Sequence, residues 1–362
     1  MTSISREEVS AILQSVTDPN NGHDLVSNKA VADIRIESDR VSIDVKLDYP
    51  AAGSSELIKQ LVVDALQEKN ISTDAISVFS EISAHSVQQG LSLLPNVKNT
   101  IAVASGKGGV GKSTTSINLA LALQAEGANV GILDADIYGP SQPRMLGLTG
   151  KPDSPDGKSI EPKISYQLQS MSIGYLIDEE TPMIWRGPMV TGALEQLLNE
   201  TNWRNLDYLV IDLPPGTGDI QLTLCQKIPV SGAVIVTTPQ DIALMDAKKA
   251  LKMFEKVNVP VLGVIENMST HICSECGHEE HIFGQGGGAK MAEQYEVGLL
   301  GSLPLDISIR EGVDHGKPTV ALQPESDTTK RYREIARKAS AKLALSAKDY
   351  TSRFPKIVVE NN

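Results

Sequence analysis

The spacing of apolar and polar residues changes near residue 85, which divides the chain into a short first part and a long second part. In residues 1–84, alternating apolar positions typical of half-buried strands lie between stretches with the apolar period of a surface helix. The pattern predicts helices over 9–16 and 54–70 and strands over 31–37, 40–49 and 75–82. The order α-β-β-α-β predicts a small α+β domain over residues 1–84.

Short polar signals indicate where these elements begin and turn. Ser5 followed by Glu8 forms a capping box, which satisfies free backbone N–H groups at the start of a helix. Ser54 or Ser55 is placed to cap the second helix. Residues 38–39, "SD", predict a hairpin turn between the first two strands.

The second part differs because its predicted strands are apolar throughout. Apolar runs of strand length recur at 101–105, 129–136, 208–215, 233–239 and 261–268, and helical stretches separate most of them. Such alternation predicts a mostly parallel sheet with helices covering both faces. The fold class is therefore α/β over residues 100–347, with 85–99 as a linker and 348–362 as a C-terminal tail.

Composition and charge limit which cellular compartments and which binding partners are possible. The net charge is −12, which disfavours binding to nucleic acid or to an anionic membrane surface. Three cysteines are too few for a disulfide framework and fit a reducing compartment. No apolar run is long enough to span a bilayer, and the N-terminal residues lack the pattern of a secretory signal. We expect a cytoplasmic protein with no nucleic-acid or membrane partner.

A glycine-rich loop lies between the first apolar strand and the following helix. It satisfies the motif G-x-x-x-x-G-K-[ST] with Gly106, Gly111, Lys112 and Ser113. Glycines allow backbone N–H groups to surround phosphate oxygens, the lysine reaches the β- and γ-phosphates, and the serine hydroxyl binds Mg²⁺. The predicted ATP-binding residues are Gly106, Lys107, Gly108, Gly109, Val110, Gly111, Lys112, Ser113 and Thr114, with Ser113 as the magnesium ligand.

Further residues near this loop carry candidate chemistry. Lys107 is a second lysine that a plain phosphate loop does not need, so it either remains in solvent or reaches the nucleotide of another subunit. Asp212 ends an apolar strand and is placed to hold the water shell of Mg²⁺. Asp134 and Asp136 end another strand, where a carboxylate could orient an attacking water, and Asp136 is the candidate for that role. Gly216 and Asp219 lie in a turn that could sense the γ-phosphate.

Cys273 and Cys276 form a C-x-x-C pair late in the chain. Two thiolates are half of the four ligands that a zinc ion or an iron–sulfur cluster requires. His271, His278 or His281 could complete a zinc site, or a two-fold dimer could bring two such loops together. The third cysteine, Cys225, is predicted to be a small buried hydrophobic residue. A C-x-x-C pair that is shared between two subunits is suited to an iron–sulfur cluster that must be released.

Four segments together resemble the Mrp/ApbC iron–sulfur cluster carrier family. They are "GKGGVGKST", "DADIYGPSQPRMLG", "DLPPGTGDIQLTL" and "ENMSTHICSECGHEEHIFGQGGG", and the resemblance covers residues 95–345. The first segment is similar to the deviant Walker A loops of the MinD/ParA proteins, the arsenite-pump ATPases and the nitrogenase iron protein. Residues 1–84 resemble the MIP18-like (DUF59) domain. The cysteine that some of those domains carry is absent from "DYPAAGSS", so no metal chemistry is assigned there.

The resemblance implies a role for each matching residue. Lys107 is expected to cross a homodimer interface to the partner's phosphates, and Asp136 to position the attacking water. Asp212 is expected to act as the Walker B aspartate and Asn267 to contact adenine. The implied function is an ATP-binding and hydrolysing homodimer. It would hold a [4Fe–4S] cluster on Cys273 and Cys276 of both chains and transfer it to apo-proteins. Catalytic roles are therefore expected for Lys107, Lys112, Asp136 and Asp212.

Other functions share parts of this pattern. A spatial organiser of the MinD/ParA type would need a membrane or DNA surface, and the basic helix predicted at 327–347 is the candidate for it. Its apolar side is small and rich in alanine, which favours packing on a sheet over insertion in lipid. A structural zinc at the C-x-x-C pair is a second alternative. A nitrogenase-like reductase is a third, although that family uses ligand cysteines that are well separated in sequence.

Overall fold

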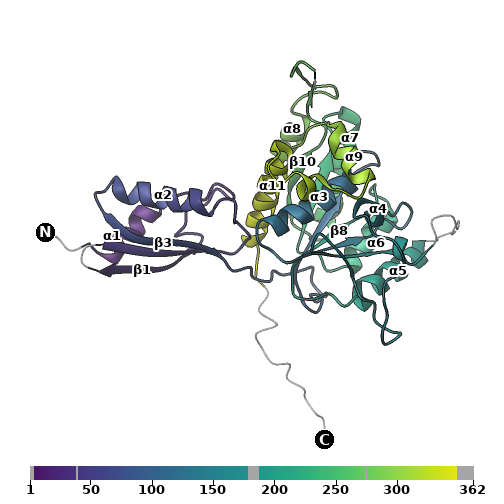
Figure 1. The fold of residues 1–362 in the computed structure, drawn as a ribbon, viewed down its shortest axis with the longest axis horizontal. Helices are drawn as coiled ribbons and strands as arrows, with labels where there is room; N and C mark the ends of the chain where they lie inside the picture. The colour runs from purple at the N-terminus through teal and green to yellow at the C-terminus, as the bar shows by residue number, and fades with distance from the viewer. Residues whose placement is uncertain (1–3, 38–39, 178–186, 274, 349–362) are drawn as a thin grey trace, which may run out of the picture.

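Figure 1 shows the computed structural model, in which a small N-terminal unit lies beside a larger α/β unit. The structure describes residues 4–37, 40–177, 187–273 and 275–348. The predicted turn at 38–39 and the predicted tail beyond residue 348 lie outside the described residues. None of the helices within these ranges has the length and apolar run that crossing a membrane requires.

The N-terminal unit has the predicted order of elements. They are α1 (Arg6–Leu13), β1 (Val31–Glu37), β2 (Arg40–Leu47), α2 (Ser55–Gln67) and β3 (Ser72–Ser80). Strand β2 lies in the middle, antiparallel to β1 and parallel to β3. Its alternating apolar residues are buried, because successive side chains of a strand point to opposite faces. Ser5 caps α1 by accepting a hydrogen bond from the Glu8 N–H at 3.1 Å.

A sheet of eight strands organises the described part of the larger unit. Its strands are β4 (Val97–Ala104), β5 (Val130–Asp134), β6 (Lys163–Ser165), β7 (Leu168–Ser172), β8 (Leu206–Asp212), β9 (Gly232–Thr237), β10 (Val261–Glu266) and β13 (Leu299–Ser302). The spatial order is β13-β10-β9-β4-β8-β5-β7-β6. All neighbours pair in parallel except β6 and β7. The predicted mostly parallel sheet is therefore confirmed.

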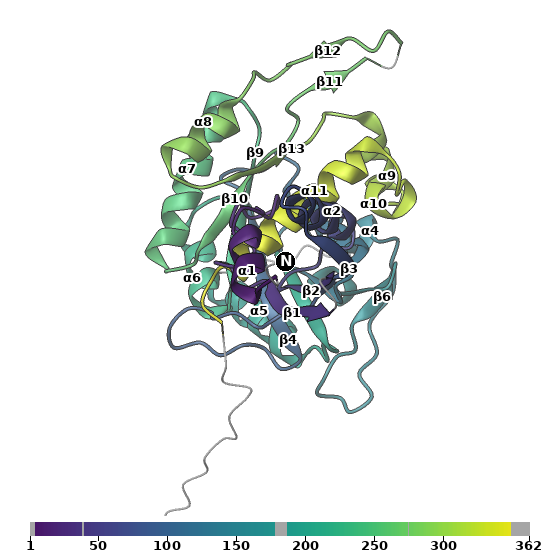
Figure 2. The ribbon, with the colours of Figure 1, turned by 90° about the vertical axis from the view of Figure 1, so that its left-hand side faces the viewer.

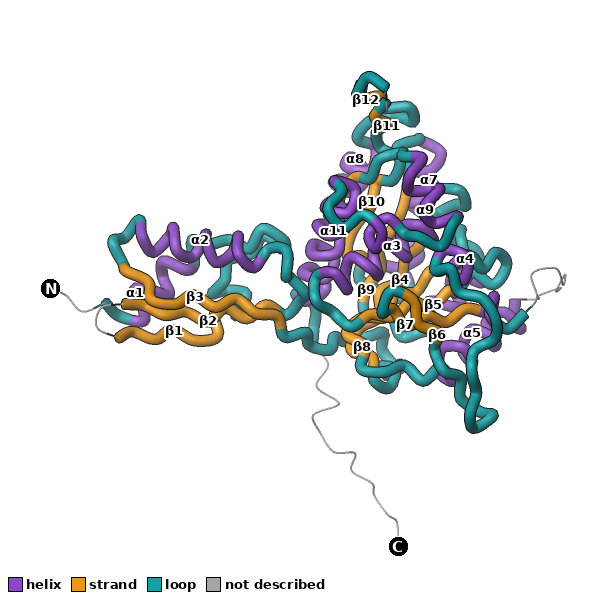
Figure 3. The backbone as a smooth tube through the Cα atoms, in the orientation of Figure 1, coloured by secondary structure: helices purple, strands orange, loops and turns teal. Residues whose placement is uncertain are grey.

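Helices cover both faces of this sheet, as the continuous apolar strands predict (Figure 3). One core holds apolar residues of α5 (Gly187–Glu200), α6 (Asp219–Lys227), α7 (Asp241–Lys256) and α8 (Gly287–Gln294). The opposite core holds those of α3 (Lys112–Ala125), α9 (Ile307–Asp314), α10 (Thr319–Leu322) and α11 (Asp327–Ala344). The short helices α4 (Gln142–Met145) and η1 (Ile173–Tyr175) follow β5 and β7. The apolar side of α11 is buried, as expected of a helix that packs on a sheet.

Two parts of the prediction need correction. The edge strand β13, "LLGS", was not expected, because it is only four residues long. Strands β6 and β7 were not expected either, because their sequences "KIS" and "LQSMS" lack the apolar runs of the other strands. A tight turn with positive φ at Tyr166 and Gln167 joins them. The segment 85–99 is not a loose connection, since His85 and Gln88 are buried and β4 already begins at Val97.

A buried carboxylate fixes the N-terminal unit against the end of α3. The Glu126 side chain is fully buried and accepts hydrogen bonds from Arg333 Nε at 2.7 Å and Arg337 Nη1 at 2.6 Å. Its second oxygen accepts from the Gly53 N–H at 2.7 Å, in the loop that leads into α2. Ala341 of α11 belongs to the core of the N-terminal unit. Glu126 therefore joins α3, α11 and the N-terminal unit at one point.

We expect Glu126→Ala to lower the free energy of unfolding by about 3 kcal/mol, because it leaves two arginines at the junction without their shared carboxylate. Urea unfolding followed by circular dichroism measures this change. Glu334→Ala is the matched control, since Glu334 makes an exposed pair with Lys338 whose contribution is at most about 1 kcal/mol. Equal stability losses in the two variants would contradict the role assigned to Glu126.

Candidate functional site

The predicted phosphate loop joins the end of β4 to the start of α3, in the centre of the sheet. Gly109 and Gly111 have φ values of +80° and +81°, which residues other than glycine rarely adopt. Gly108 and Gly109 are exposed, and no atom lies within 4 Å of the position a Cβ would take at either residue. The loop is therefore open above these two glycines, next to a helix N-terminus, and its residues fit a phosphate group.

The rest of the loop is packed tightly against its neighbours. A Cβ at Gly106 would lie 2.1 Å from the backbone of Asp246 in α7, so only glycine fits there. The side chain of Asn267, which follows β10, donates to the Val110 carbonyl at 2.9 Å. A Cβ at Gly111 would lie 2.3 Å from the Asn267 amide nitrogen. The predicted adenine contact Asn267 thus supports the phosphate loop itself.

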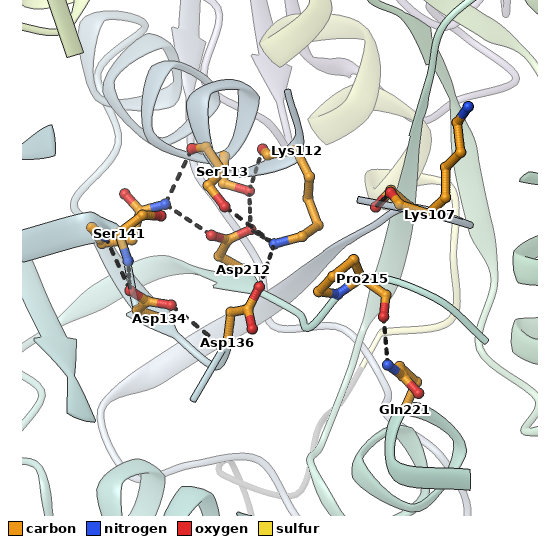
Figure 4. A network of polar contacts seen from close by, with 12 residues as sticks. Lys107, Lys112, Ser113, Asp134, Asp136, Ser141, Asp212, Pro215 and Gln221 are labelled. Carbon is orange, nitrogen blue, oxygen red and sulfur yellow. Dashed lines mark hydrogen bonds and ion pairs between the residues drawn. The ribbon is translucent and has the colours of Figure 1, made fainter. Parts of the chain in front are cut away.

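A buried ion pair joins the loop to the end of β8 (Figure 4). Lys112 Nζ lies 2.6 Å from Asp212 Oδ1, and the two side chains are 6% and 0% exposed. Asp136 Oδ2 lies 3.9 Å from the same nitrogen, and Ser113 Oγ accepts a hydrogen bond from it at 3.2 Å. The structure therefore brings three other predicted site residues, Asp212, Asp136 and Ser113, around Lys112.

Two further residues belong to this network: Gln142, which was not predicted, and Asp134, which was predicted only as a carboxylate at the end of its strand. Gln142, at the start of α4, donates from Nε2 to Asp212 Oδ2 at 3.0 Å. Asp134 is fully buried at the end of β5 and accepts from the backbone N–H groups of Ser141 and Gln142 at 2.9 and 3.0 Å. The sequence feature that could have indicated both residues is their position in "DADIYGPSQP", at the end of a buried strand.

Burial changes the protonation of the acids in this network. Burial, followed by the neighbouring charge of Asp212, raises the pKa of Asp134 to about 7. Burial also raises the pKa of Asp136, against the nearby positive charge of Lys112. The site is therefore a low-dielectric environment in which charge is compensated locally.

Lys107 does not join this cluster. Figure 4 shows its side chain directed away from Lys112 and Asp212 of the same chain. Gly216 of the turn after β8 has a φ of +101° and donates its N–H to the Ser105 carbonyl at 2.9 Å, next to the phosphate loop. Asp219 begins α6 and is exposed. The turn that contains Gly216 is therefore in direct contact with the phosphate loop.

Cys273 and Cys276 lie at the tip of a hairpin that projects from the larger unit. The hairpin consists of β11 (His271–Ile272) and β12 (Glu279–Glu280), and Figure 2 shows it extending beyond α8 and α9. Cys276 is exposed and Cys273 is half-buried. The backbone N–H groups of Cys276 and Glu275, followed by the Cys276 thiol, favour the thiolate form of Cys273 and lower the pKa of that thiol. The tip thus presents two accessible sulfurs.

Among the residues that the structure describes, the nearby histidines do not form a metal site with the two cysteines. His271 Nδ1 lies 3.1 Å from the Leu305 carbonyl and His281 Nδ1 lies 3.0 Å from the Ser269 carbonyl, so each nitrogen is a donor. Within the described ranges, no group of three His, Cys, Asp or Glu side chains is close enough to hold a metal ion. Cys225 is fully buried, as predicted, and burial raises the pKa of its thiol to about 12.

The fold and this site define a P-loop NTPase. Residues 96–340 match the family described as NUBPL iron-transfer P-loop NTPase, and residues 6–73 match the family described as iron-sulfur cluster assembly protein. The chain belongs to the NUBPL iron-transfer P-loop NTPase family, and its N-terminal unit to the second family. The resemblance to Mrp/ApbC proteins and the predicted fold class are confirmed.

Named relatives extend over most of the chain. The iron-sulfur cluster carrier protein of Haemophilus influenzae is 51% identical over 348 residues, which cover 95% of this chain and 93% of that protein. The iron-sulfur cluster transfer protein NUBPL of Mus musculus is 52% identical over 255 residues, 70% of this chain and 80% of that protein. A solved nucleotide-binding protein from Archaeoglobus fulgidus, in complex with ADP, is 38% identical with a TM-score of 0.57, covering 64% of this chain and 90% of that chain.

We expect Cys273 to react with iodoacetamide at a lower pH than a free thiol, because its lowered pKa increases the fraction of thiolate at any given pH. In a Cys276→Ser background, the midpoint of the pH–rate profile should lie below about 8.5, the value for an unperturbed cysteine. Cys225 serves as the internal control and should react only after unfolding. A midpoint at or above about 8.5 would contradict the hydrogen-bonding assigned to Cys273.

Proposed function

We propose that this protein is an ATP-binding and hydrolysing carrier of iron–sulfur clusters that works as a homodimer. Its cargo would be a [4Fe–4S] cluster held on the C-x-x-C pairs of two chains and passed to apo-proteins. The observation that carries the proposal is the pair Cys273 and Cys276 at the tip of a projecting hairpin, on a P-loop NTPase of the iron-transfer family. The names of the relatives from Haemophilus influenzae and Mus musculus support the same function.

The number of sulfur ligands favours a site shared between subunits. A [4Fe–4S] cluster takes about four thiolates, and the hairpin of one chain offers two. A two-fold axis presents the same surface of each chain to the other, so two hairpin tips can contribute four sulfurs. A cluster held by exposed cysteines at an interface can be released without unfolding either chain. A zinc ion bound by four thiolates is the alternative occupant of the same geometry.

ATP would bind at the loop between β4 and α3. Backbone N–H groups from Gly106 to Thr114 would surround its phosphates, and Lys112 would turn from Asp212 towards the β- and γ-phosphates. When bound, Mg²⁺ neutralises charge on the phosphates, and the Ser113 hydroxyl and Asp212 carboxylate are the residues placed to hold it. Asn267 supports the loop and is proposed to contact adenine.

Hydrolysis would break the bond between the γ-phosphorus and its bridging oxygen, with a water supplying the new oxygen. Asp136 lies beside Lys112 at the same edge of the sheet, where it can accept a hydrogen bond from that water. Lys107 points away from its own site, which fits a contact with the phosphates of the second chain. The turn containing Gly216 contacts the loop and then leads into α6, so it can link nucleotide state to the subunit interface.

The spatial-organiser alternative loses its main support. The apolar residues of α11 are buried against the sheet and against α3, and therefore cannot insert in a membrane. Two of its basic residues, Arg333 and Arg337, are paired with Glu126. The unpaired cysteines and the acidic charge fit a cytoplasmic location, which we propose for this protein.

We expect Cys273→Ala and Cys276→Ala each to abolish retention of the cluster, because a single remaining thiol per chain leaves two ligands for four irons. The measurement is iron and acid-labile sulfide after anaerobic reconstitution and gel filtration. Binding of a fluorescent ATP analogue should be unchanged, which shows that the variants are folded. Cys225→Ala is the matched control and should keep its cluster. Full cluster content in either hairpin variant would contradict the proposal.

We expect Lys112→Ala to lose nucleotide binding, because it removes the charge that faces the phosphates. Lys107→Ala should bind nucleotide but hydrolyse it at least about 100-fold more slowly, a loss comparable to removing one charged group that stabilises the transition state. Steady-state phosphate release and nucleotide titration separate the two effects. Equal ATPase rates in wild type and Lys107→Ala would exclude a role across the dimer for this lysine.

A further inference from the structure

A glutamine outside the predicted site residues contacts both residues proposed to hold magnesium. Gln142 is fully buried at the start of α4. Its Nε2 donates to Asp212 Oδ2 at 3.0 Å and to the Ser113 backbone carbonyl at 3.1 Å. One amide therefore bridges the end of β8 and the phosphate loop, 70 and 29 residues away in sequence. We propose that Gln142 is the positioning residue that holds the Asp212 carboxylate in place for the magnesium–nucleotide complex.

The orientation of the amide is fixed by its neighbours. Both partners of the side chain are acceptors, so the NH₂ group has to face them and the oxygen has to face away. Gln142 Oε1 is buried without a hydrogen-bond partner among the described residues. A buried acceptor without a partner costs stability. An apolar residue at this position would avoid that cost. The glutamine amide, however, donates two hydrogen bonds that an apolar residue could not make.

The two oxygens of Asp212 are held by different donors. Oδ1 accepts from Lys112 Nζ at 2.6 Å and from Ser116 Oγ at 2.9 Å. Gln142 Nε2 is the donor to Oδ2 among the described residues. When Lys112 turns to the phosphates, Asp212 keeps one neutral donor on each oxygen. Two donors on opposite oxygens fix the plane of a carboxylate, whereas Ser116 alone would leave it free to rotate.

Gln142 is itself held firmly. Its backbone N–H and that of Ser141 donate to Asp134 Oδ2 at 3.0 and 2.9 Å. Asp134 also accepts from the backbone N–H of Asp136 at 3.1 Å. The start of α4 is thereby tied to the end of β5, which pairs with β8 in register. Gln142 thus sets Asp212 relative to Ser113 from a third, rigid element.

This inference rests on the proposed binding of magnesium and ATP, and it predicts a specific defect. Residues that orient a metal ligand by a hydrogen bond typically change metal affinity by about 10- to 100-fold when they are replaced. Gln142→Met keeps the length of the side chain and removes the donor. The variant should bind nucleotide normally without magnesium and gain much less affinity when magnesium is added.

The experiment titrates a fluorescent ATP analogue into the full chain in EDTA and again in saturating MgCl₂. The ratio of the two dissociation constants measures the contribution of magnesium. We expect this ratio to fall by about 10- to 100-fold in Gln142→Met, with the value in EDTA unchanged. Gln169→Met is the matched control, because in the described part of the chain the Gln169 amide in β7 bonds only the backbone of Arg204. The control should keep the wild-type ratio.

Each other outcome has a defined meaning. A ratio within about twofold of wild type in Gln142→Met overturns the inference, given that the effect expected is about 10-fold or more. Loss of affinity in EDTA as well, in both Gln142→Met and a second variant, Gln142→Leu, also overturns it, because the residue then supports the loop and not the magnesium ligand. A wild-type chain without any magnesium effect refutes the proposed function itself, independently of Gln142.

Discussion

The buried pair between Lys112 and Asp212 is the interaction on which the rest of the site depends. It joins the helix after the phosphate loop to the strand next to β4, and both charges are removed from water. An unpaired charge at this depth costs several kcal/mol, so each of the two residues constrains the other. In the structure, the carboxylate holds the lysine inside the loop. In the proposed function, the phosphate oxygens of ATP would offer the lysine an alternative partner, and Asp212 would then be available to magnesium.

The helix that carries Lys112 is fixed by a carboxylate at its other end as well. Glu126 follows α3 and binds two arginines of α11 and the backbone at Gly53. One helix therefore runs from the nucleotide site to the N-terminal unit (Figure 1). A shift of α3 on nucleotide binding has to be accommodated at Glu126, because a buried ion pair does not stretch without a large cost. The hairpin with the cysteines projects from a different part of the larger unit, beyond α8.

Local sequence patterns predicted the structural features that depend on residues close together in the chain. The glycine motif, the apolar strands and Asp212 at a strand end were all readable, because each is encoded within about ten positions. The bridge made by Gln142 and the junction at Glu126 were not, since each depends on a partner 70 or more residues away. Strands β6 and β7 lack an apolar run because Ser170 and Ser172 take buried positions in β7 and because β6 has three residues, none of them buried.

In the proposed function the cysteine hairpin is the cargo site, and because it offers two sulfurs per chain, a [4Fe–4S] cluster would need a second chain. Native mass spectrometry of the wild-type chain, reconstituted anaerobically with iron and sulfide, tests this directly. We predict a dimer whose mass exceeds that of two chains by one [4Fe–4S] cluster. A monomer that carries its own cluster, or a dimer that carries zinc and no sulfide, would contradict a cluster shared between two hairpins.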